Sequence, residues 1–368
     1  MPVRRLPSQP NLDHLKNQAK DLLKEHAARD LGAAQRIREF HPRYSSAADN
    51  QIFAAQLKLS DAQLTIARES GFQSWPRLKR HIEQPSAINQ LSLPHHERIA
   101  EAQFRRAVDL LDAGDADGLR AHLKRHPKLA HQRVEFEGWN YFQNPSLLEF
   151  VAGNPMRRKT MPRNITEMAK VILDAGADKL AIDETLALVA TGSWPRECGV
   201  QLALIELLCD YGADLQGAMR STALHGERDA LHALIARGAH IDLPVAAALG
   251  RVEEFCHLFP AATPEDRHLA LALASQFGHV EIVRILLDAG ENPDRYHPVG
   301  GHSHATPLHQ AAGFGHENLV RLLVERGARL DMKDTLWRAT PAEWAQHEGK
   351  KEIEHYLRAA ESERASSS

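Results

Sequence analysis

A short phrase that recurs through the C-terminal two thirds of the chain most constrains its fold. Each copy is an apolar run, with aliphatic residues three and four apart, that is followed by a glycine. The copies are "VILDAGAD" (171–178), "ELLCDYGAD" (206–214), "ALIARGAH" (233–240), "RILLDAGEN" (284–292) and "RLLVERGAR" (321–329). Aliphatic residues at this spacing form one buried stripe of a helix, and glycine adopts the left-handed conformation that ends a helix at little energetic cost. The phrase therefore predicts a helix and its C-terminal stop.

A shorter helix and a tight turn precede this phrase in its clearest copies, residues 269–291 and 306–328. "FGH" occurs in both, at 277–279 and 314–316, and the second copy opens with "TPLH". The spacing and the T-P-L-H opening resemble the ankyrin repeat, whose period is about 33 residues. The resemblance is specific over 267–359, and it implies an all-α solenoid of helix–turn–helix units joined by hairpin fingers.

Weaker copies extend the pattern backwards, so we expect an ankyrin-repeat solenoid over 99–360 with about eight partly degenerate repeats. Whether the repeats in 217–265 are regular helix pairs stays open. We expect a helical module over 1–84, a polar, proline-bounded linker over 85–98, and a flexible tail over 361–368.

The N-terminal module begins with an amphipathic helix, "LDHLKNQAKDLLKEH", that Asn11 is expected to cap. Its apolar stripe consists of Leu12, Leu15, Ala19, Leu22 and Leu23. Together with "LSDAQLTIARESGFQSWPRLKRHIE", this segment resembles a helical module that precedes ankyrin repeats in a group of bacterial proteins. The resemblance supports the fold and implies no particular activity.

Charge and cysteine content narrow the classes of function. The formal net charge is −3, so no global positive field recruits nucleic acid or an anionic membrane. Three cysteines without a CxxC pair are typical of a reducing compartment, and no run of about 18 apolar residues is present to span a membrane. We therefore expect a cytoplasmic protein with no membrane partner.

Several histidines have an expected structural role in the repeats. The resemblance implies that Thr306 caps a helix, that Pro307 lies in its first turn, and that His309 reaches back to the loop backbone. His316 and its counterpart His279 follow a glycine at the turn between two helices. We interpret these five residues as structural.

His297, His302 and His304 lie in the finger before Thr306, and the repeat pattern does not explain them. If "HSH" is extended, both rings lie on one face, and His297 could complete a three-nitrogen set for zinc or another divalent metal. The alternative is a polar recognition loop without metal, which we favour, and we expect no cofactor.

We expect the chain to be a binding module for a protein partner rather than an enzyme, with the partner on the finger loops and the concave face. The alternative is a metal-dependent enzyme or small-molecule binder built on the finger histidines, with Ser303 or Glu343 as acid or base. The residues predicted to form the binding surface are Arg295, Tyr296, His297, His302, His304, Trp337, Arg338, Trp344 and His347.

Two further loops carry open alternatives. The basic cluster at 157–163 could hold a phosphate or an acidic segment, or it could be a solvated loop, and without aromatic residues between its cations we do not expect a nucleic-acid partner. The aromatic loop of Phe136, Trp139, Tyr141 and Phe142 could line a recognition groove or seal a junction with the N-terminal module.

Overall fold

The computed structural model describes residues 6–7, 10–83, 93–136 and 141–366. These residues form helices and connecting loops; no strand occurs among them, and one isolated antiparallel bridge joins Arg133 to Ser146. The expected all-α fold is confirmed. Trp139 of the aromatic loop lies outside the described residues.

The chain divides into two compact units, which are described separately. The first unit combines residues 1–83 with 242–368, and the second is 84–241. The division differs from the predicted solenoid of 99–360 because the C-terminal repeats share their contacts with the N-terminal module.

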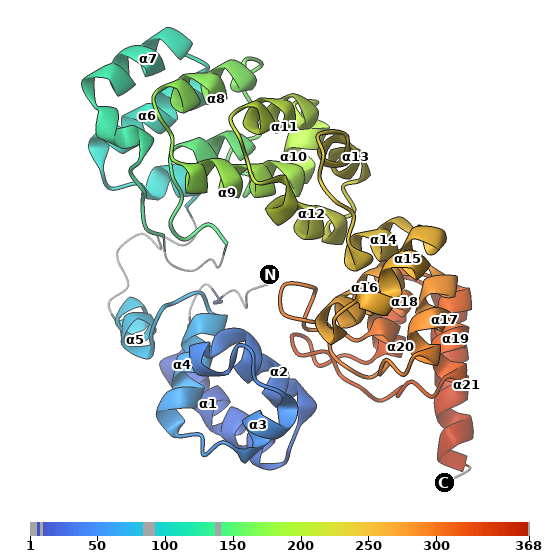
Figure 1. Ribbon diagram of the computed structural model, residues 1–368. Helices are drawn as coiled ribbons and strands as arrows, with labels where there is room; N and C mark the ends of the chain where they lie inside the picture. The colour runs from blue at the N-terminus through green and yellow to red at the C-terminus, as the bar shows by residue number, and fades with distance from the viewer. Residues whose placement is uncertain (1–5, 8–9, 84–92, 137–140, 367–368) are drawn as a thin grey trace. The chain divides into compact units, whose positions relative to one another are not determined.

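The N-terminal module holds five α-helices and a 3-10 turn, Pro42–Tyr44 (Figure 1). The helices are α1 (Leu12–Ala27), α2 (Leu31–Phe40), α3 (Asp49–Ala54), α4 (Leu59–Glu69) and α5 (Trp75–Glu83). The Asn11 side chain accepts hydrogen bonds from the backbone N–H groups of Asp13 and His14, at 2.8 and 3.2 Å, so the predicted cap is confirmed.

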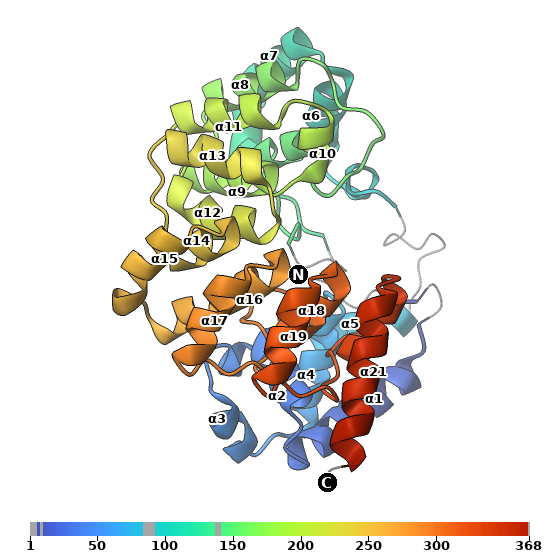
Figure 2. The same ribbon diagram turned by 90° about the vertical axis from the view of Figure 1, so that its right-hand side faces the viewer.

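The C-terminal part of the first unit consists of successive helix pairs. The pairs are α14 (Leu243–Leu249) with α15 (Val252–Leu258), α16 (Pro264–Phe277) with α17 (Val280–Asp288), α18 (Pro307–Phe314) with α19 (Glu317–Glu325), and α20 (Pro341–His347) with α21 (Lys351–Ser366). The first helices of the pairs contact one another in one row, as do α15, α17 and α19 in a second row (Figure 2). Burial of apolar stripes between neighbouring pairs stabilises such a stack.

The C-terminal helix continues into the segment 361–368 that was predicted to be a flexible tail. The Arg364 guanidinium donates hydrogen bonds to the carbonyls of Ala328 and Val324, both at 2.8 Å. These bonds tie the last turns of α21 to the end of α19, which explains why the helix runs to Ser366.

The second unit contains further helix pairs. They are α6 (Ala102–Ala113) with α7 (Ala116–Arg125), the 3-10 helix η5 (Leu148–Ala152) with α8 (Ile165–Asp174), α9 (Lys179–Ala190) with α11 (Gln201–Asp210), and α12 (Leu215–Leu224) with α13 (Arg228–Ala236). The insertion "SWPRE" forms the short helix α10 (Ser193–Glu197), and 3-10 turns occupy His95–Arg98 and Pro127–Ala130. In 217–265 the pairs are regular but short, and the 3-10 turn Phe259–Ala261 follows them.

The C-terminal end of the predicted linker is folded. His95 and His96 are buried, and the His95 ring lies 4.9 Å from that of Phe136 and 5.1 Å from that of Phe142. Both phenylalanines are buried. Phe136 and Phe142 of the aromatic loop therefore pack against the start of their own unit, and the burial of these two rings accounts for the folding of 95–98, whereas Tyr141 is 42% exposed.

Glycines end the helices as the recurring phrase predicts. All five glycines of the phrase have a positive φ, between 80° and 101°, which is the left-handed conformation. A second set of glycines separates the two helices of a pair and lies under a histidine of the next pair. The His279 ring donates from Nε2 to the Ala248 carbonyl at 3.0 Å, and His316 donates in the same way to Gln276 at 2.8 Å. These two histidines thus join neighbouring repeats.

Replacing Gly278 with alanine should destabilise the first unit more than the same change at Gly290. Both positions have a positive φ, 76° and 91°, so each alanine pays about 1–2 kcal/mol for the left-handed conformation. At Gly278 the new Cβ would also lie 2.6 Å from His316 Nδ1, whereas nothing lies within 4 Å at Gly290. We expect an additional loss of about 1–3 kcal/mol at Gly278. Urea unfolding followed by circular dichroism measures both variants, and equal losses would contradict the packing of His316 on this glycine.

Candidate functional site

Two loops of the first unit carry most of the residues that were predicted to bind a partner. The first finger (291–305) connects α17 to α18, and the second finger (328–339) connects α19 to α20. They are bonded side by side, since the Thr335 N–H donates to the His304 carbonyl at 3.0 Å and the Tyr296 hydroxyl donates to the Lys333 carbonyl at 2.5 Å. The two fingers therefore act as one surface.

The first finger is compact. The His297 N–H donates to the Ala305 carbonyl at 2.9 Å, and the Ala305 N–H donates to the His302 carbonyl at 3.0 Å. His302 has a φ of 61°, in the left-handed region. The extended arrangement that was considered for His302 and His304 is therefore wrong, because Gly300, Gly301 and the left-handed His302 turn the chain back on itself.

The histidines around this finger are mostly buried and neutral. His297 is only 1% exposed, and burial lowers its pKa well below the usual value, helped by neighbouring His268 and His302. Burial also lowers the pKa of His304 to about 4 and that of His268 to about 3. His268 Nε2 donates to the Tyr296 carbonyl at 2.8 Å, so it holds the finger on α16.

The Thr-Pro-Leu-His opening of α18 has the geometry of a helix start. The His309 Nδ1 accepts from the Thr306 N–H at 3.3 Å, while Nε2 donates to the Ala339 carbonyl of the second finger at 3.1 Å. Pro307 occupies the first turn. Burial lowers the pKa of His309 to about 4. The ring thus bonds the start of α18 to the adjacent finger.

Asp334 organises the second finger. Its fully buried carboxylate accepts hydrogen bonds from the backbone N–H groups of Leu336 (2.8 Å), Trp337 (2.6 Å) and Ala339 (2.8 Å). The Trp344 indole N–H donates a fourth, at 3.1 Å. Sequence reasoning did not identify Asp334, because one acidic residue in a polar loop carries no signal that distinguishes it from a solvated one.

An aromatic cluster lies next to the part of the second finger that Asp334 holds together. The His304 ring is 5.5 Å from that of Trp337 and 5.7 Å from that of Trp344, and the two indoles are 5.9 Å apart. His302 lies 6.0 Å from His304. Trp344 is half-buried, but Trp337 is 67% exposed. The fingers thus present a large aromatic side chain to solvent from a rigid base.

The remaining predicted residues are placed apart from this cluster. The Arg338 guanidinium lies 4.0 Å from Glu25 and 3.9 Å from Asp30 of the N-terminal module. Arg295 is exposed and Tyr296 is buried. His347 is 85% exposed on α20 and pairs with Glu348 at 3.0 Å. The structure therefore brings together His302, His304, Trp337 and Trp344, while it turns Arg338 toward the module.

The alternative of metal ligation depends on how the finger histidines are grouped. In the part of the chain that the structure describes, no three histidine, cysteine, aspartate or glutamate side chains are grouped so that they could hold a metal ion. Within the described ranges, neither ring nitrogen of His297 has a hydrogen-bond partner, and the ring is buried. The Ser303 hydroxyl donates to the Glu39 carboxylate at 2.7 Å. It therefore does not pair with Glu343, the other residue predicted as acid or base in the enzyme alternative.

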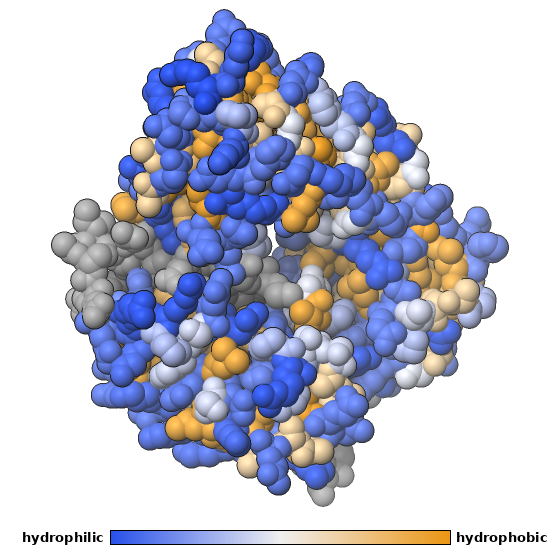
Figure 3. All heavy atoms as spheres, turned by 60° about the vertical axis from the view of Figure 1, so that its left-hand side comes forward, coloured by the Kyte–Doolittle hydropathy of each residue, from blue (hydrophilic) through white to orange (hydrophobic). Residues whose placement is uncertain are grey.

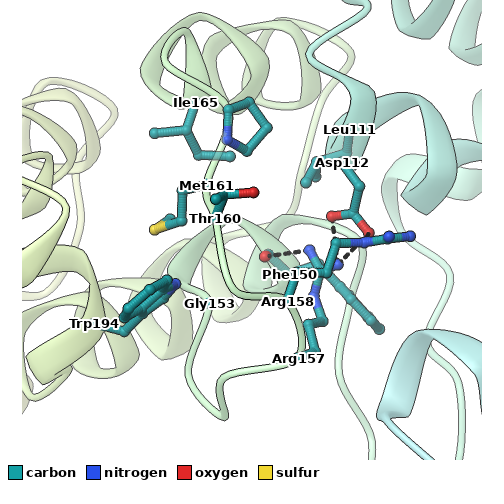
Figure 4. A pocket seen from close by; sticks show the side chains of 11 residues that line it. Leu111, Asp112, Phe150, Gly153, Arg157, Arg158, Thr160, Met161, Ile165 and Trp194 are labelled. Atoms are coloured by element: carbon teal, nitrogen blue, oxygen red, sulfur yellow. Dashed lines mark hydrogen bonds and ion pairs between the residues drawn. The ribbon is translucent and has the colours of Figure 1, made fainter.

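The basic loop of the second unit is not a free cluster of cations. Arg157 is buried, forms an ion pair with Asp112, and donates to the Phe150 carbonyl at 2.9 Å (Figure 4). Arg158 bonds the same carboxylate at 2.5 Å. A small hollow beside them is lined by Met161 and Trp194. Asp112 thus engages two of the four cations of this loop, Arg157 and Arg158, and offsets one of their charges.

Hydrophobic side chains form scattered patches among hydrophilic ones on the face shown in Figure 3. None of the helices in the described ranges is both long enough and apolar enough to cross a membrane.

Comparison with known proteins identifies a family match in the C-terminal repeats and two relatives of the chain. The family described as "Ankyrin repeats (3 copies)" matches residues 243–334 and 271–362. Human "Cyclin-dependent kinase inhibitor 2A" is 32% identical over 122 residues, which are 32% of this chain and 76% of that protein. Bovine "Cyclin-dependent kinase 4 inhibitor B" is 28% identical over 126 residues, which are 33% of this chain and 93% of that protein.

Proposed function

Because the chain belongs to the ankyrin-repeat proteins, we propose that it is a protein-interaction module that binds a protein partner on its fingers and concave face. Stacked helix pairs offer an extended surface that suits another protein better than it suits a small substrate. The names of both relatives describe inhibitors of protein kinases, which are proteins that act on other proteins. That agrees with a protein partner here.

The single observation that carries the proposal is the exposure of Trp337. The Trp337 indole is 67% exposed, so it leaves apolar surface in contact with water. Tryptophan is also enriched among the residues that dominate binding energy at protein interfaces. Asp334 and Trp344 hold the loop beneath it, so little conformational entropy remains to be lost on binding. The His304 ring packs at 5.5 Å from Trp337 and supports it from the first finger.

Replacing Trp337 with alanine should weaken partner binding by at least about 30-fold, the effect of losing about 2 kcal/mol at a central interface residue. Stability should change little, because the side chain is mostly exposed. Proteins retained by the immobilised full chain from a lysate of its source would be identified by mass spectrometry, and the affinity of each purified candidate measured by calorimetry.

Leu180→Ala is the matched control, since Leu180 is 57% exposed but lies in the second unit. A partner that binds the wild type and both variants equally would place the interface elsewhere. Absence of any retained protein would argue against the proposed function.

A further inference from the structure

Helix α2 of the N-terminal module is enclosed on two faces. Ala33, Ile37 and Phe40 form its apolar stripe, and all three are buried. The opposite stripe consists of Gly32, Gln35 and Glu39, which are three and four residues apart and so share one helix face. Gln35 is only 2% exposed, although a polar residue on this face would ordinarily be solvated.

The first finger covers this polar stripe. Gln35 Nε2 donates to the His297 carbonyl at 3.2 Å, and Ser303 Oγ donates to Glu39 Oε2 at 2.7 Å. A Cβ at Gly32 would lie 3.5 Å from the Tyr296 hydroxyl. All three positions of the stripe thus meet one loop that is more than 250 residues away in sequence. Figure 1 shows the loops of the C-terminal helix pairs directed toward the N-terminal helices.

The second finger adds a charge contact. The Arg338 guanidinium faces the carboxylates of Glu25 and Asp30 across about 4 Å, and its φ of 59° is in the left-handed region. Half-exposed ion pairs at this distance contribute little free energy but favour one orientation of the two surfaces. The module therefore presents the carboxylates of Glu25, Asp30 and Glu39 where the fingers present a hydroxyl donor and a cation, while the Gln35 amide donates in the opposite direction, to a finger carbonyl.

The contacts between the N-terminal module and the two fingers are weak enough for the module to separate from the fingers. Apart from the close approach of Tyr296 to Gly32, the contacts described here are hydrogen bonds or ion pairs, and such bonds contribute only about 1 kcal/mol net each. The buried ion pair of Arg36 with Glu69, at 2.9 and 3.0 Å, lies within the module and does not depend on the fingers. The module can therefore leave the fingers as an intact body, as the least stable contacts of a protein open first.

We propose that the N-terminal module is a built-in ligand of the fingers, with α2 as the docked helix, and that an outside protein partner must displace it. This inference rests on the proposed function, because it names what regulates the same surface. Trp337 stays exposed at the edge of the docked surface, where a partner can make first contact. A partner with acidic and acceptor groups in place of Glu25, Asp30 and Glu39 fits the released fingers.

Substitution of Gly32 by glutamine tests the docking. Glutamine favours a helix more than glycine does, so α2 should be retained. Its Cβ would lie 3.0 Å from the Asp30 carboxylate, which must shift slightly, and 3.5 and 3.6 Å from Tyr296 and Arg338 of the fingers, where the rest of the new side chain has to go. Ala54→Gln adds the same side chain at an exposed position of α3 and is the matched control. Hydrogen exchange of the full chain, measured by mass spectrometry, follows the amides of the first finger, with the amides of α1 reporting whether the module is folded.

We expect the finger amides of Gly32→Gln to exchange at least about tenfold faster while α1 stays protected, and the affinity for the partner captured in the preceding experiment to rise about tenfold. Ala54→Gln should change neither quantity. If Gly32→Gln also unfolds α1, Ser303→Asp takes its place, because it sets a second carboxylate against Glu39 from the finger side.

Unchanged exchange of the finger with a folded module would overturn the inference, and so would unchanged partner affinity after release of the finger. Either result leaves the proposed function standing. Loss of the proposed function has a different signature, because no Trp337-dependent partner would then bind the wild type, Gly32→Gln or Ser303→Asp.

Discussion

Replacing Asp334 with asparagine is expected to lower the free energy of unfolding of the first unit by about 2–4 kcal/mol and to weaken partner binding. Each carboxylate oxygen accepts two N–H groups, from Leu336 and Trp337 on one side and from Ala339 and Trp344 on the other. Asparagine has one acceptor oxygen, so its amide N–H₂ would face two donors. Two buried donors then lose their acceptor, and the loop under Trp337 is no longer fixed.

Asp331→Asn is the matched control for Asp334→Asn. Asp331 belongs to the same finger, but its side chain is 73% exposed and pairs with Arg329 at 2.9 Å. Its replacement should change the free energy of unfolding by less than about 0.5 kcal/mol. Urea unfolding and calorimetric titration of the partner measure both effects. Equal stability of the two variants would show that the Asp334 carboxylate does not support the finger.

Acid should destabilise the first unit over the range in which free histidine titrates. Burial lowers the pKa of His304 and His309 to about 4, that of His268 to about 3, and that of His297 well below its usual value. In the unfolded chain these rings bind protons near pH 6.5, so unfolding takes up protons between about pH 4 and 6.5. The unfolding free energy therefore falls as the pH is lowered, by up to about 1.4 kcal/mol per pH unit for each ring.

Glu39 acts in the opposite direction. Burial raises the pKa of Glu39 to about 7. The hydrogen bond from Ser303 lowers this pKa, but the effect of burial is larger. The folded protein then holds a proton that the unfolded chain releases, which favours the folded state as the pH falls from about 7 to 4.5. Burial also raises the pKa of Glu291, which acts in the same direction as Glu39. Several histidines oppose these two carboxyl groups, so we expect a net loss of stability below about pH 6.5.

His268→Gln should reduce the pH dependence by about one proton, since its amide can still donate to the Tyr296 carbonyl while it does not titrate. His347→Gln, at a position that is 85% exposed, serves as the comparison and should leave the slope unchanged. Urea midpoints between pH 5 and 7.5 give the slope for each chain. A slope that is the same in His268→Gln and the wild type would mean that this ring is protonated in the folded protein.

Much of the helical fold could be predicted because its signals are local. The recurring phrase around Gly290 or Gly327 contains both the buried stripe of a helix and the glycine that ends the helix. Both glycines have the left-handed φ that the phrase predicts. Asn11 caps α1 because its side chain needs only the next two or three N–H groups. Neighbouring helix pairs then stack without help from distant parts of the chain.

The finger surface could be predicted only in part. The sequence predicted a binding surface that includes finger histidines and two tryptophans, and His302, His304, Trp337 and Trp344 do come together. The burial of His297 could not be foreseen, because it depends on groups from α16 and α18 that surround the ring. The same holds for Asp334, whose donors become neighbours only after the loop closes.

The sequence alone determined the helices, their stops and the repeat that stacks them, because these follow from periodicities within one or two helical turns. Tertiary structure decided which polar residues are solvated. Gln35 and Glu39 lie on a polar face of α2, and nothing near them in the sequence distinguishes that face from an exposed one. Their burial requires the first finger, which the chain supplies only after the whole second unit. Hydrogen bonds between groups so far apart leave no periodic trace in the sequence, since each depends on geometry that exists only in the folded protein.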